Sequence, residues 1–339
     1  MASGHADFRA LERANRRQTV LLVVVFLILF CALGFGFDYL VGTVRVVDGN
    51  FAGFPVLTIA ALIIGSIQSL VSYFGGASLV LATAHARPLA ADTTKHQMVL
   101  DVIHEMALAA RMPVPRAYVI DDPAPNAFAS GRDPSHSVIC VTQGLIDEMD
   151  REETQGVLGH EMAHIRDYDI RTMTMIAVLV GGVAMLADFV TRWAWFGGLG
   201  ERRSCDRDSD SGDAGAIIAV LVLVLAILAP IFSQLIAMAV SREREYLADA
   251  SSVEFTRNPR ALLRALEHIA QTESPLRNAS RGIAHLFIVN PLAGAGDRGE
   301  GFLANLFSTH PALVKRIERL RALSRRAQDR WEFDPSLMT

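Results

Sequence analysis

The sequence predicts an α+β protein that is mostly helical, is integral to a membrane and carries one small β-sheet. Three observations predict this class. The 339-residue chain is 51% hydrophobic with a mean hydropathy of +0.29, which is too apolar for an ordinary soluble domain. Four apolar stretches have about the 20 residues that a membrane-spanning helix needs. Between the second and third stretches, short runs rich in β-branched residues alternate with helical patterns.

The four apolar stretches cover residues 20–37, 56–84, 173–190 and 214–240. The first two carry no charge, the third carries only Asp188, and the fourth is interrupted by Pro230 and Gln234. We expect the first stretch to be a retained anchor, because it is longer than a signal peptide's apolar core and no small-residue cleavage site follows it. For the last two stretches, a buried core helix remains the alternative to a membrane crossing.

The distribution of arginines predicts how the chain is oriented in the membrane. Four arginines precede the first stretch: Arg9, Arg13, Arg16 and Arg17. Residues 38–53, in contrast, hold only Arg45 against two aspartates. The positive-inside rule then predicts a cytoplasmic N-terminus, and two crossings return the chain to the cytoplasm. The four arginines in residues 191–213 argue mildly against full crossings by the last two stretches.

The chain is expected to divide into four parts. These are a tail with two spans (1–85), a cytoplasmic unit with a small sheet (86–170), two further apolar helices around a polar loop (171–240), and a helical C-terminal part (241–339). In the second part, Asp92 is expected to cap a helix that ends before Pro113. Strand-like runs follow at 117–120, 127–129 and 137–142, and then a helix from Asp150 to Arg166.

That last helix contains the most informative motif of the chain, H-E-x-x-H. On a helix, His160 and His164 share one face, so both imidazoles can bind one metal ion, and Glu161 lies beside them. The alternative without a functional site is a solvated histidine pair with a surface glutamate. Gly156 and Gly159 are poor helix formers, so their presence indicates that another element packs closely one turn before the histidines.

A zinc hydrolase needs three protein ligands and one open position for water. The strongest candidate for the third ligand is Glu245, directly after the fourth apolar stretch. Asp249 lies four residues later on the same helical face and can orient a ligand. Spacing alone does not rank Glu245 far above Glu243.

The combination of H-E-M-A-H at 160–164 with E-Y-L-A-D at 245–249 resembles the HtpX family of membrane-bound zinc metalloproteases. These are relatives of the prenyl-protein (CAAX) proteases within the gluzincin class. N-A-F-A-S-G at 126–131 resembles the family's edge-strand motif, and F-S-T-H-P at 307–311 with Arg316 resembles its C-terminal motif. The resemblance covers most of the chain, including the order of the apolar stretches. Residues 199–213 and 293–301 depart from the pattern as insertions.

The resemblance implies a role for each matching residue. One zinc ion per subunit would be held by His160, His164 and Glu245, with Asp249 supporting a ligand. Glu161 would act as the general base on the metal-bound water. His310 and Arg316 would lie near the reacting carbonyl, and Asn126, Ala127, Phe128 and Ala129 would form an edge strand that pairs with an extended substrate. The simpler alternatives are a first-turn helix residue before Pro311 for His310 and a turn residue after Pro125 for Asn126.

The resemblance further implies a zinc metalloendopeptidase of the bacterial inner membrane. It would cleave misfolded membrane proteins or other polypeptides from the cytoplasmic side in quality control or stress response. The alternatives are a CAAX-type processing protease and a non-catalytic membrane scaffold. The net charge of −4 gives no reason to expect a nucleic-acid partner, and the three cysteines form no disulfide framework.

Overall fold

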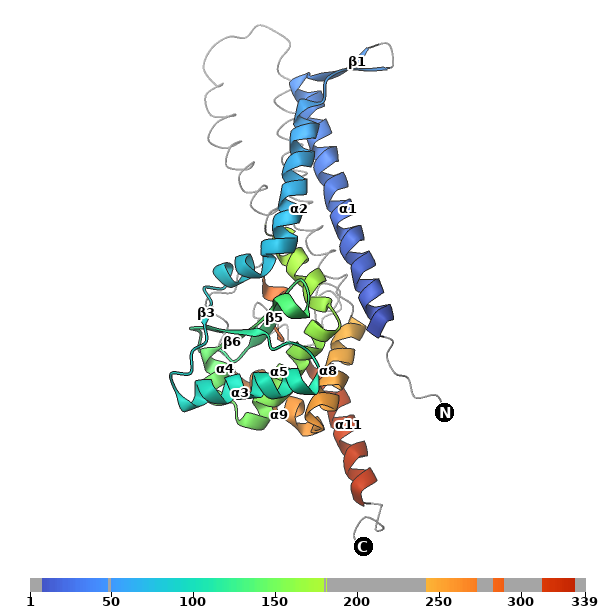
Figure 1. Ribbon diagram of the computed structural model, residues 1–339. Coiled ribbons are helices and arrows are strands. Elements are labelled where there is room, and N and C mark those ends of the chain that lie inside the picture. The colour runs from blue at the N-terminus through green and yellow to red at the C-terminus, as the bar shows by residue number, and fades with distance from the viewer. Residues whose placement is uncertain are drawn as a thin grey trace.

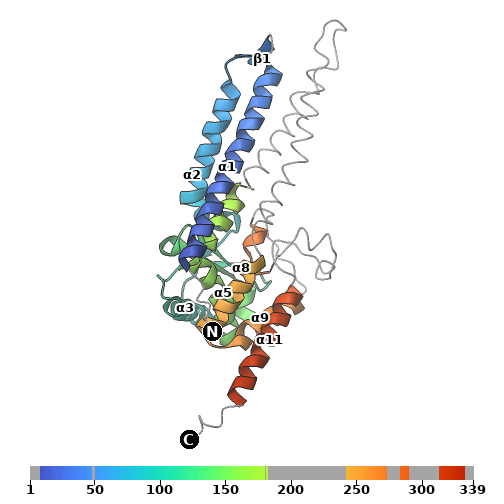
Figure 2. The same ribbon diagram turned by 90° about the vertical axis from the view of Figure 1, so that its right-hand side faces the viewer.

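The structure, a computed structural model, describes residues 8–47, 50–179, 181, 242–272, 283–289 and 313–332. Two long helices extend together from a body in which helices surround a small sheet (Figure 1). The C-terminal helix α11 (Leu313–Glu332) extends from the opposite end of that body (Figures 1 and 2). The prediction of a mostly helical chain with a small sheet is therefore confirmed for the described residues.

The two long helices are α1 (Phe8–Val41) and α2 (Val56–Thr83), joined by the hairpin of β1 (Val44–Val47) and β2 (Asn50–Gly53). They lie side by side in both views (Figures 1 and 2). A Cβ atom on Gly34 would come within 2.6 Å of the Thr58 Cα atom, so glycine permits this close approach. Both helices are long and apolar enough to span a membrane, over Arg13–Gly36 and Val56–Thr83.

A buried carboxylate connects the far ends of these helices. Asp38, near the end of α1, accepts hydrogen bonds from the Leu57 N–H at 3.0 Å and the Thr58 N–H at 2.8 Å. It also accepts from the hydroxyls of Thr43 and Thr58. The Asp38 side chain thus caps the first turn of α2, where the helix dipole favours a negative charge. The cap fixes the angle at which the chain enters α2.

The third predicted apolar stretch is helical where it is described, and residues 169–179 and 181 are helical. Met173, Ile176 and Leu179 are buried against the rest of the molecule. The remainder of that stretch, the stretch 214–240 and the loop between them lie outside the described residues, as do the insertions 199–213 and 293–301.

The main sheet has four strands in the order β3-β4-β6-β5. The strands are β3 (Arg87–Pro88), β4 (Arg116–Ile120), β5 (Ala127–Gly131) and β6 (Ser137–Thr142). β4 and β6 are parallel, and the other two pairs are antiparallel. All residues of β5 and β6 are buried, although β5 lies at the edge of the sheet. Side chains and another segment of the chain must therefore cover that edge.

The helices of the body are α3 (Thr94–Ala109), α4 (Gln143–Glu148), α5 (Arg151–Arg166), α8 (Arg242–Thr256) and α9 (Pro259–Gln271). Thr93 rather than Asp92 caps α3, because the Thr93 hydroxyl accepts the His96 N–H. Asp150 caps α5 as predicted, in a reciprocal capping box with Glu153. The N-cap of α3 therefore lies one residue later than the sequence predicted.

Helix α5 lies at the centre of the body, between β5 on one side and α8 and α9 on the other. Its apolar face, which includes Val157, Leu158 and Met162, is buried. A Cβ atom on Gly156 would come within 2.4 Å of the Leu262 nitrogen on α9. The close packing that the glycines predicted is therefore confirmed, and it holds the motif helix between its neighbours.

Candidate metal centre

Helix α5 brings the two motif histidines together in the interior. His160 and His164 have exposed fractions of 0% and 4%, and their Nε2 atoms are 3.2 Å apart. The solvated-pair alternative is wrong, because these imidazoles are buried.

Helix α8 supplies the carboxylate. The Glu245 side chain is buried, with Oε2 3.6 Å from His160 Nε2 and Oε1 3.6 Å from His164 Nε2. One ligand atom from each of the three residues lies within 4.8 Å of the others. Zinc ligands at about 2.0–2.2 Å in tetrahedral geometry lie about 3.3–3.6 Å from one another. The observed separations and the donor set therefore fit a zinc ion.

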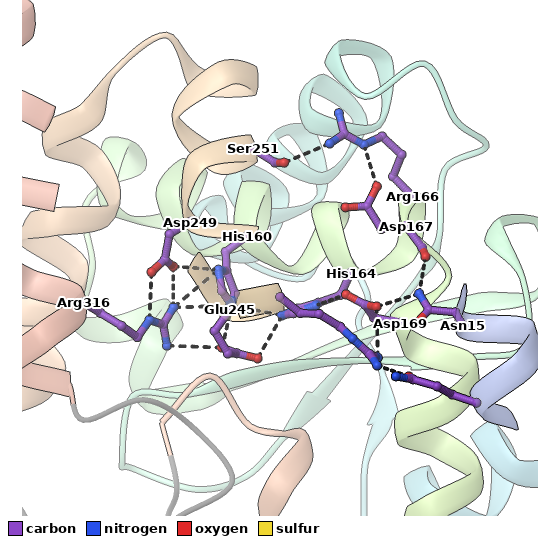
Figure 3. A network of polar contacts seen from close by, with 12 residues as sticks. Asn15, His160, His164, Arg166, Asp167, Asp169, Glu245, Asp249, Ser251 and Arg316 are labelled. Carbon is purple, nitrogen blue, oxygen red and sulfur yellow. Dashed lines mark hydrogen bonds and ion pairs between the residues drawn. The ribbon is translucent and has the colours of Figure 1, made fainter. Parts of the chain in front are cut away.

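Each imidazole has a carboxylate on its other nitrogen (Figure 3). His160 Nδ1 lies 3.0 Å from Asp249 Oδ1, and His164 Nδ1 lies 3.1 Å from Asp169 Oδ2. An N–H on Nδ1 leaves the lone pair of Nε2 free for a metal ion. Asp249 thus lies where the sequence placed a supporting residue, whereas Asp169 is a supporting residue that the sequence analysis missed.

Arg316, from α11, holds Asp249 in place. Its Nε and Nη2 atoms donate to the two Asp249 carboxylate oxygens at 3.0 and 2.6 Å. Its Nη1 atom lies 3.7 Å from Glu245 Oε2, and the residue is only 1% exposed. The carboxylates of Asp249 and Glu245 raise the pKa of Arg316 further, although burial alone would lower it. The arginine therefore stays charged beside the candidate metal ligands.

Glu161 lies between the histidines and β5. It is 2% exposed, and its carboxylate accepts a hydrogen bond from the main-chain N–H of Ala129. Burial, the largest cause, and the nearby charge of Glu245 raise its pKa to about 7. A carboxylate with this pKa can take up and release a proton near neutral pH.

The two histidines differ in their electrostatics. Burial and the positive charge of Arg316 lower the pKa of His160 to about 4. Burial would also lower the pKa of His164, but the hydrogen bond with Asp169 and the charge of Glu245 outweigh it and raise the pKa to about 9. His160 is therefore a neutral ligand, whereas His164 must lose a proton when a metal ion binds.

The predicted edge strand is covered by another segment of the chain. The Ile288 N–H donates to the Ala127 carbonyl at 2.9 Å, and the Asn126 amide nitrogen donates to the Val289 carbonyl at 2.9 Å. Arg316 Nη1 donates to the Ile288 carbonyl, also at 2.9 Å. Residues 287–289 thus lie along the β5 backbone, next to the guanidinium at the candidate metal centre. The Phe128 ring packs edge-on against the Phe287 ring, within a separate apolar cluster.

The structure brings together most of the predicted site residues. His160, Glu161, His164, Glu245, Asp249 and Arg316 form one buried network. His310 lies outside the described residues, and so does the side chain of Glu243. The choice of Glu245 over Glu243, which spacing left open, agrees with the geometry.

Comparison with known proteins gives the same motifs a family context. Residues 93–324 match Peptidase family M48. A "Protease HtpX homolog" of Lactobacillus helveticus is 40% identical over 310 residues, which are 91% of this chain and 97% of the relative. A second protein with this name, from Lactobacillus acidophilus, is 41% identical over 90% of this chain and 96% of the relative. A third protein with this name, from Caldanaerobacter subterraneus, is 38% identical over 93% of this chain and 97% of the relative.

Among solved structures, the crystal structure of S. mikatae Ste24p has 17% sequence identity to this chain and a TM-score of 0.45. The match covers 92% of this chain and 67% of that chain. A similarity of this size bears on neither the fold nor the function.

Proposed function

The chain belongs to peptidase family M48, among relatives named as HtpX protease homologues, and we propose that it is a zinc-dependent endopeptidase acting on membrane proteins. Family membership and two candidate membrane helices make it a membrane-associated metalloprotease. The observation that carries the finer proposal is the buried cluster of two imidazoles and one carboxylate, with Glu161 beside it.

His160, His164 and Glu245 are the residues that would hold the zinc ion. When bound, zinc supplies Lewis acidity and lowers the pKa of a coordinated water to about 7. Asp249 and Asp169 orient the two imidazoles, so the ligands are preorganised by the protein.

Glu161 is the proposed general base. It would accept a proton from the attacking water and pass it to the leaving amine. The Ala129 N–H orients the Glu161 carboxylate from β5, which ties the base to the predicted substrate strand.

Arg316 is the proposed donor to the reacting carbonyl, together with His310. The guanidinium already donates to one peptide carbonyl, that of Ile288, while its other nitrogens hold Asp249. This geometry supports the proposal that Arg316 hydrogen-bonds a substrate carbonyl as negative charge develops on it.

The proposed substrate strand would pair with this edge at the Asn126 side-chain amide, the Ala127 carbonyl and Ala129, whose N–H already donates to the Glu161 carboxylate. Residues 288 and 289 now occupy the Ala127 carbonyl and the Asn126 amide. A substrate can use these groups only after this segment has left them. Because the contacts are to the main chain, the proposed recognition depends little on the substrate sequence.

We further propose an inner-membrane location, with the active site facing the cytoplasm and a role in quality control of misfolded membrane proteins. The arginines before the first span support the orientation. Helices α5 and α8, which carry the candidate ligands, lie in the body from which α1 and α2 extend (Figure 1). This arrangement supports substrates that lie in or near the bilayer.

The testing experiment replaces Glu161 by glutamine. Glu161→Gln is expected to retain one zinc per chain but to lose hydrolysis of a test polypeptide by several orders of magnitude, because an amide cannot accept the proton. Glu254→Gln, on the exposed side of α8, is the matched control and should behave as wild type. Near wild-type cleavage by Glu161→Gln would refute its role as the base. Zinc binding without cleavage by the wild-type chain would favour a scaffold.

A further inference from the structure

The first membrane helix reaches the candidate metal centre through Asn15. This side chain is 3% exposed and lies at the end of α1 nearest the body. Its Nδ2 atom donates to the Asp169 Oδ1 atom at 2.7 Å and to the Asp167 carbonyl at 2.7 Å (Figure 3). The other oxygen of Asp169 faces His164 Nδ1 at 3.1 Å. Two hydrogen bonds in series therefore connect the membrane helix to a candidate metal ligand.

The bond from Asn15 fixes the direction of the bond to His164. The terminal torsion of an aspartate is soft, so one hydrogen bond to His164 does not fix the plane of the Asp169 carboxylate. A second bond, from Asn15 to the opposite oxygen, does fix it. The fixed carboxylate then sets both the tautomer and the ring orientation of His164.

Asn15 also closes the turn that carries Asp169. Helix α5 ends at Arg166, and the chain then turns through Asp167 and Tyr168 before the next helix begins. Tyr168 has a φ of +62°, a left-handed conformation that costs about 1–2 kcal/mol for a residue with a Cβ atom. The Asn15 bond to the Asp167 carbonyl stabilises this turn, and the turn determines how far Asp169 lies from His164.

A neighbouring contact ties α1 to the third ligand. Arg244 directly precedes Glu245 on α8; its guanidinium donates to the Gln18 side chain and lies 3.4 Å from Asp169 Oδ1. Asn15 contacts Asp169 directly, and Gln18, one turn further along α1, contacts it through Arg244. The membrane helix therefore contacts the support of His164 and the residue next to Glu245.

We propose that Asn15 is a positioning residue of the zinc site: by fixing the Asp169 carboxylate it holds the His164 imidazole in its metal-binding orientation. The first membrane helix α1 then helps to orient a metal ligand and also anchors the chain. This inference rests on the proposed zinc site.

The test compares Asn15→Ala with Thr19→Val in the full-length chain in detergent. Thr19 lies one turn further along α1, is 7% exposed and contacts the Thr172 hydroxyl at 3.1 Å, on the helix that begins with Asp169. The zinc dissociation constant is measured by competition with a chelator, and the absorption spectrum is recorded on the Co²⁺-loaded chain. Asn15→Ala should weaken zinc binding about tenfold and alter the spectrum, whereas Thr19→Val should change neither.

A second comparison tests the route through Asp169. Asp169→Ala should weaken zinc binding about 10–100-fold, and adding Asn15→Ala to it should cause no further loss. If Asn15→Ala does not fold, Asn15→Ser is used, because serine is too short to reach both acceptors. Wild-type zinc affinity and an unchanged Co²⁺ spectrum in the Asn15 variant would overturn the inference, as would losses that multiply in the double variant. Absence of zinc binding by the wild-type chain would instead refute the proposed zinc site.

Discussion

The packing of α5 against α9 gives a prediction whose size follows from the structure. In Gly156→Ala, the new Cβ atom would lie 2.4 Å from the Leu262 nitrogen and 2.6 Å from the Ala261 carbonyl carbon. Favourable contacts require about 3.5 Å, so the two helices must separate by about 1 Å. The nearest atoms belong to the α9 backbone, so no side-chain rotation can relieve the contact.

Two opposing terms set the stability of this variant. Alanine favours a helix over glycine by about 1 kcal/mol, whereas overpacking a well-packed interior costs about 1–3 kcal/mol. Because the contact is between backbones, we expect overpacking to win by about 1–2 kcal/mol. Gly156 lies one turn before His160, so the same shift displaces the metal ligands relative to Glu245. A misplacement of about 1 Å can lower the catalytic rate by about a hundredfold.

The assay measures thermal unfolding, zinc content and cleavage of a test polypeptide by the purified variant. Gly75→Ala is the matched control, because a Cβ atom at this position on α2 would have no neighbouring atom within 4 Å. That variant should be at least as stable as wild type, by up to about 1 kcal/mol from helix propensity, and should keep wild-type activity. If Gly156→Ala unfolds at the wild-type temperature and cleaves at the wild-type rate, the close contact between α5 and α9 does not constrain the site.

Four further predictions concern the site and the membrane. Arg316→Ala removes the positive charge that pairs with the buried Asp249 carboxylate. The free energy of unfolding, measured with denaturant, should therefore fall by about 3–5 kcal/mol. The values of kcat and kcat/KM should fall together by about a hundredfold. A change confined to KM would instead indicate substrate positioning. Asn126→Ala should raise KM and leave zinc content unchanged; lost zinc would contradict a substrate contact. A chelator should abolish cleavage and lower the unfolding temperature, and zinc should restore both; chelator-resistant cleavage would exclude a metal mechanism. In single-cysteine variants of intact cells, a cysteine at position 135 should be protected from an external reagent, and labelling there would overturn the cytoplasmic assignment. Labelling of Cys205 would support two full crossings by the stretches 173–190 and 214–240, and protection of Cys205 would support helices that stay on the cytoplasmic side.

Local features of the fold could be predicted from the sequence because neighbouring residues determine them. The Asp150 cap and the buried face with Val157 and Met162 each follow from residues within a few positions. Gly156 indicated a close contact, but its partner on α9 could not be read from neighbouring residues. The error at α3, where Thr93 rather than Asp92 is the cap, has the same origin. Both residues are good caps, and only the backbone geometry decides between them.

The third ligand could not be chosen from spacing, because Glu243 and Glu245 differ only in the face of α8 on which they lie. The packing of α8 against α5 decides which carboxylate meets the histidines, and that packing involves residues about 80 positions apart in sequence. The motif resemblance supplied this choice, and the geometry agrees with it. Asn15 had no such motif, since its partner Asp169 lies 154 residues away. Only a weak indication of this contact was present in the sequence. Asn15 is one amide among the arginines before the first span, and Asp169 is one aspartate just beyond the end of the motif helix.

The buried charges around His160, His164 and Glu245 explain why a bound cation would stabilise this cluster. Among the described residues around the three ligands, the carboxylates of Glu161, Asp169, Glu245 and Asp249 are buried. The Arg316 guanidinium is buried with them, and the Arg244 guanidinium lies 3.4 Å from Asp169. Unbalanced negative charge in a low-dielectric interior is unfavourable, and raised pKa values at Glu161 and His164 are the response of the protein alone. A divalent ion among the three ligands would balance the charge without those protons. Loss of the ion should therefore weaken the packing of α5 against α8 as well as the chemistry, because the same carboxylates hold both.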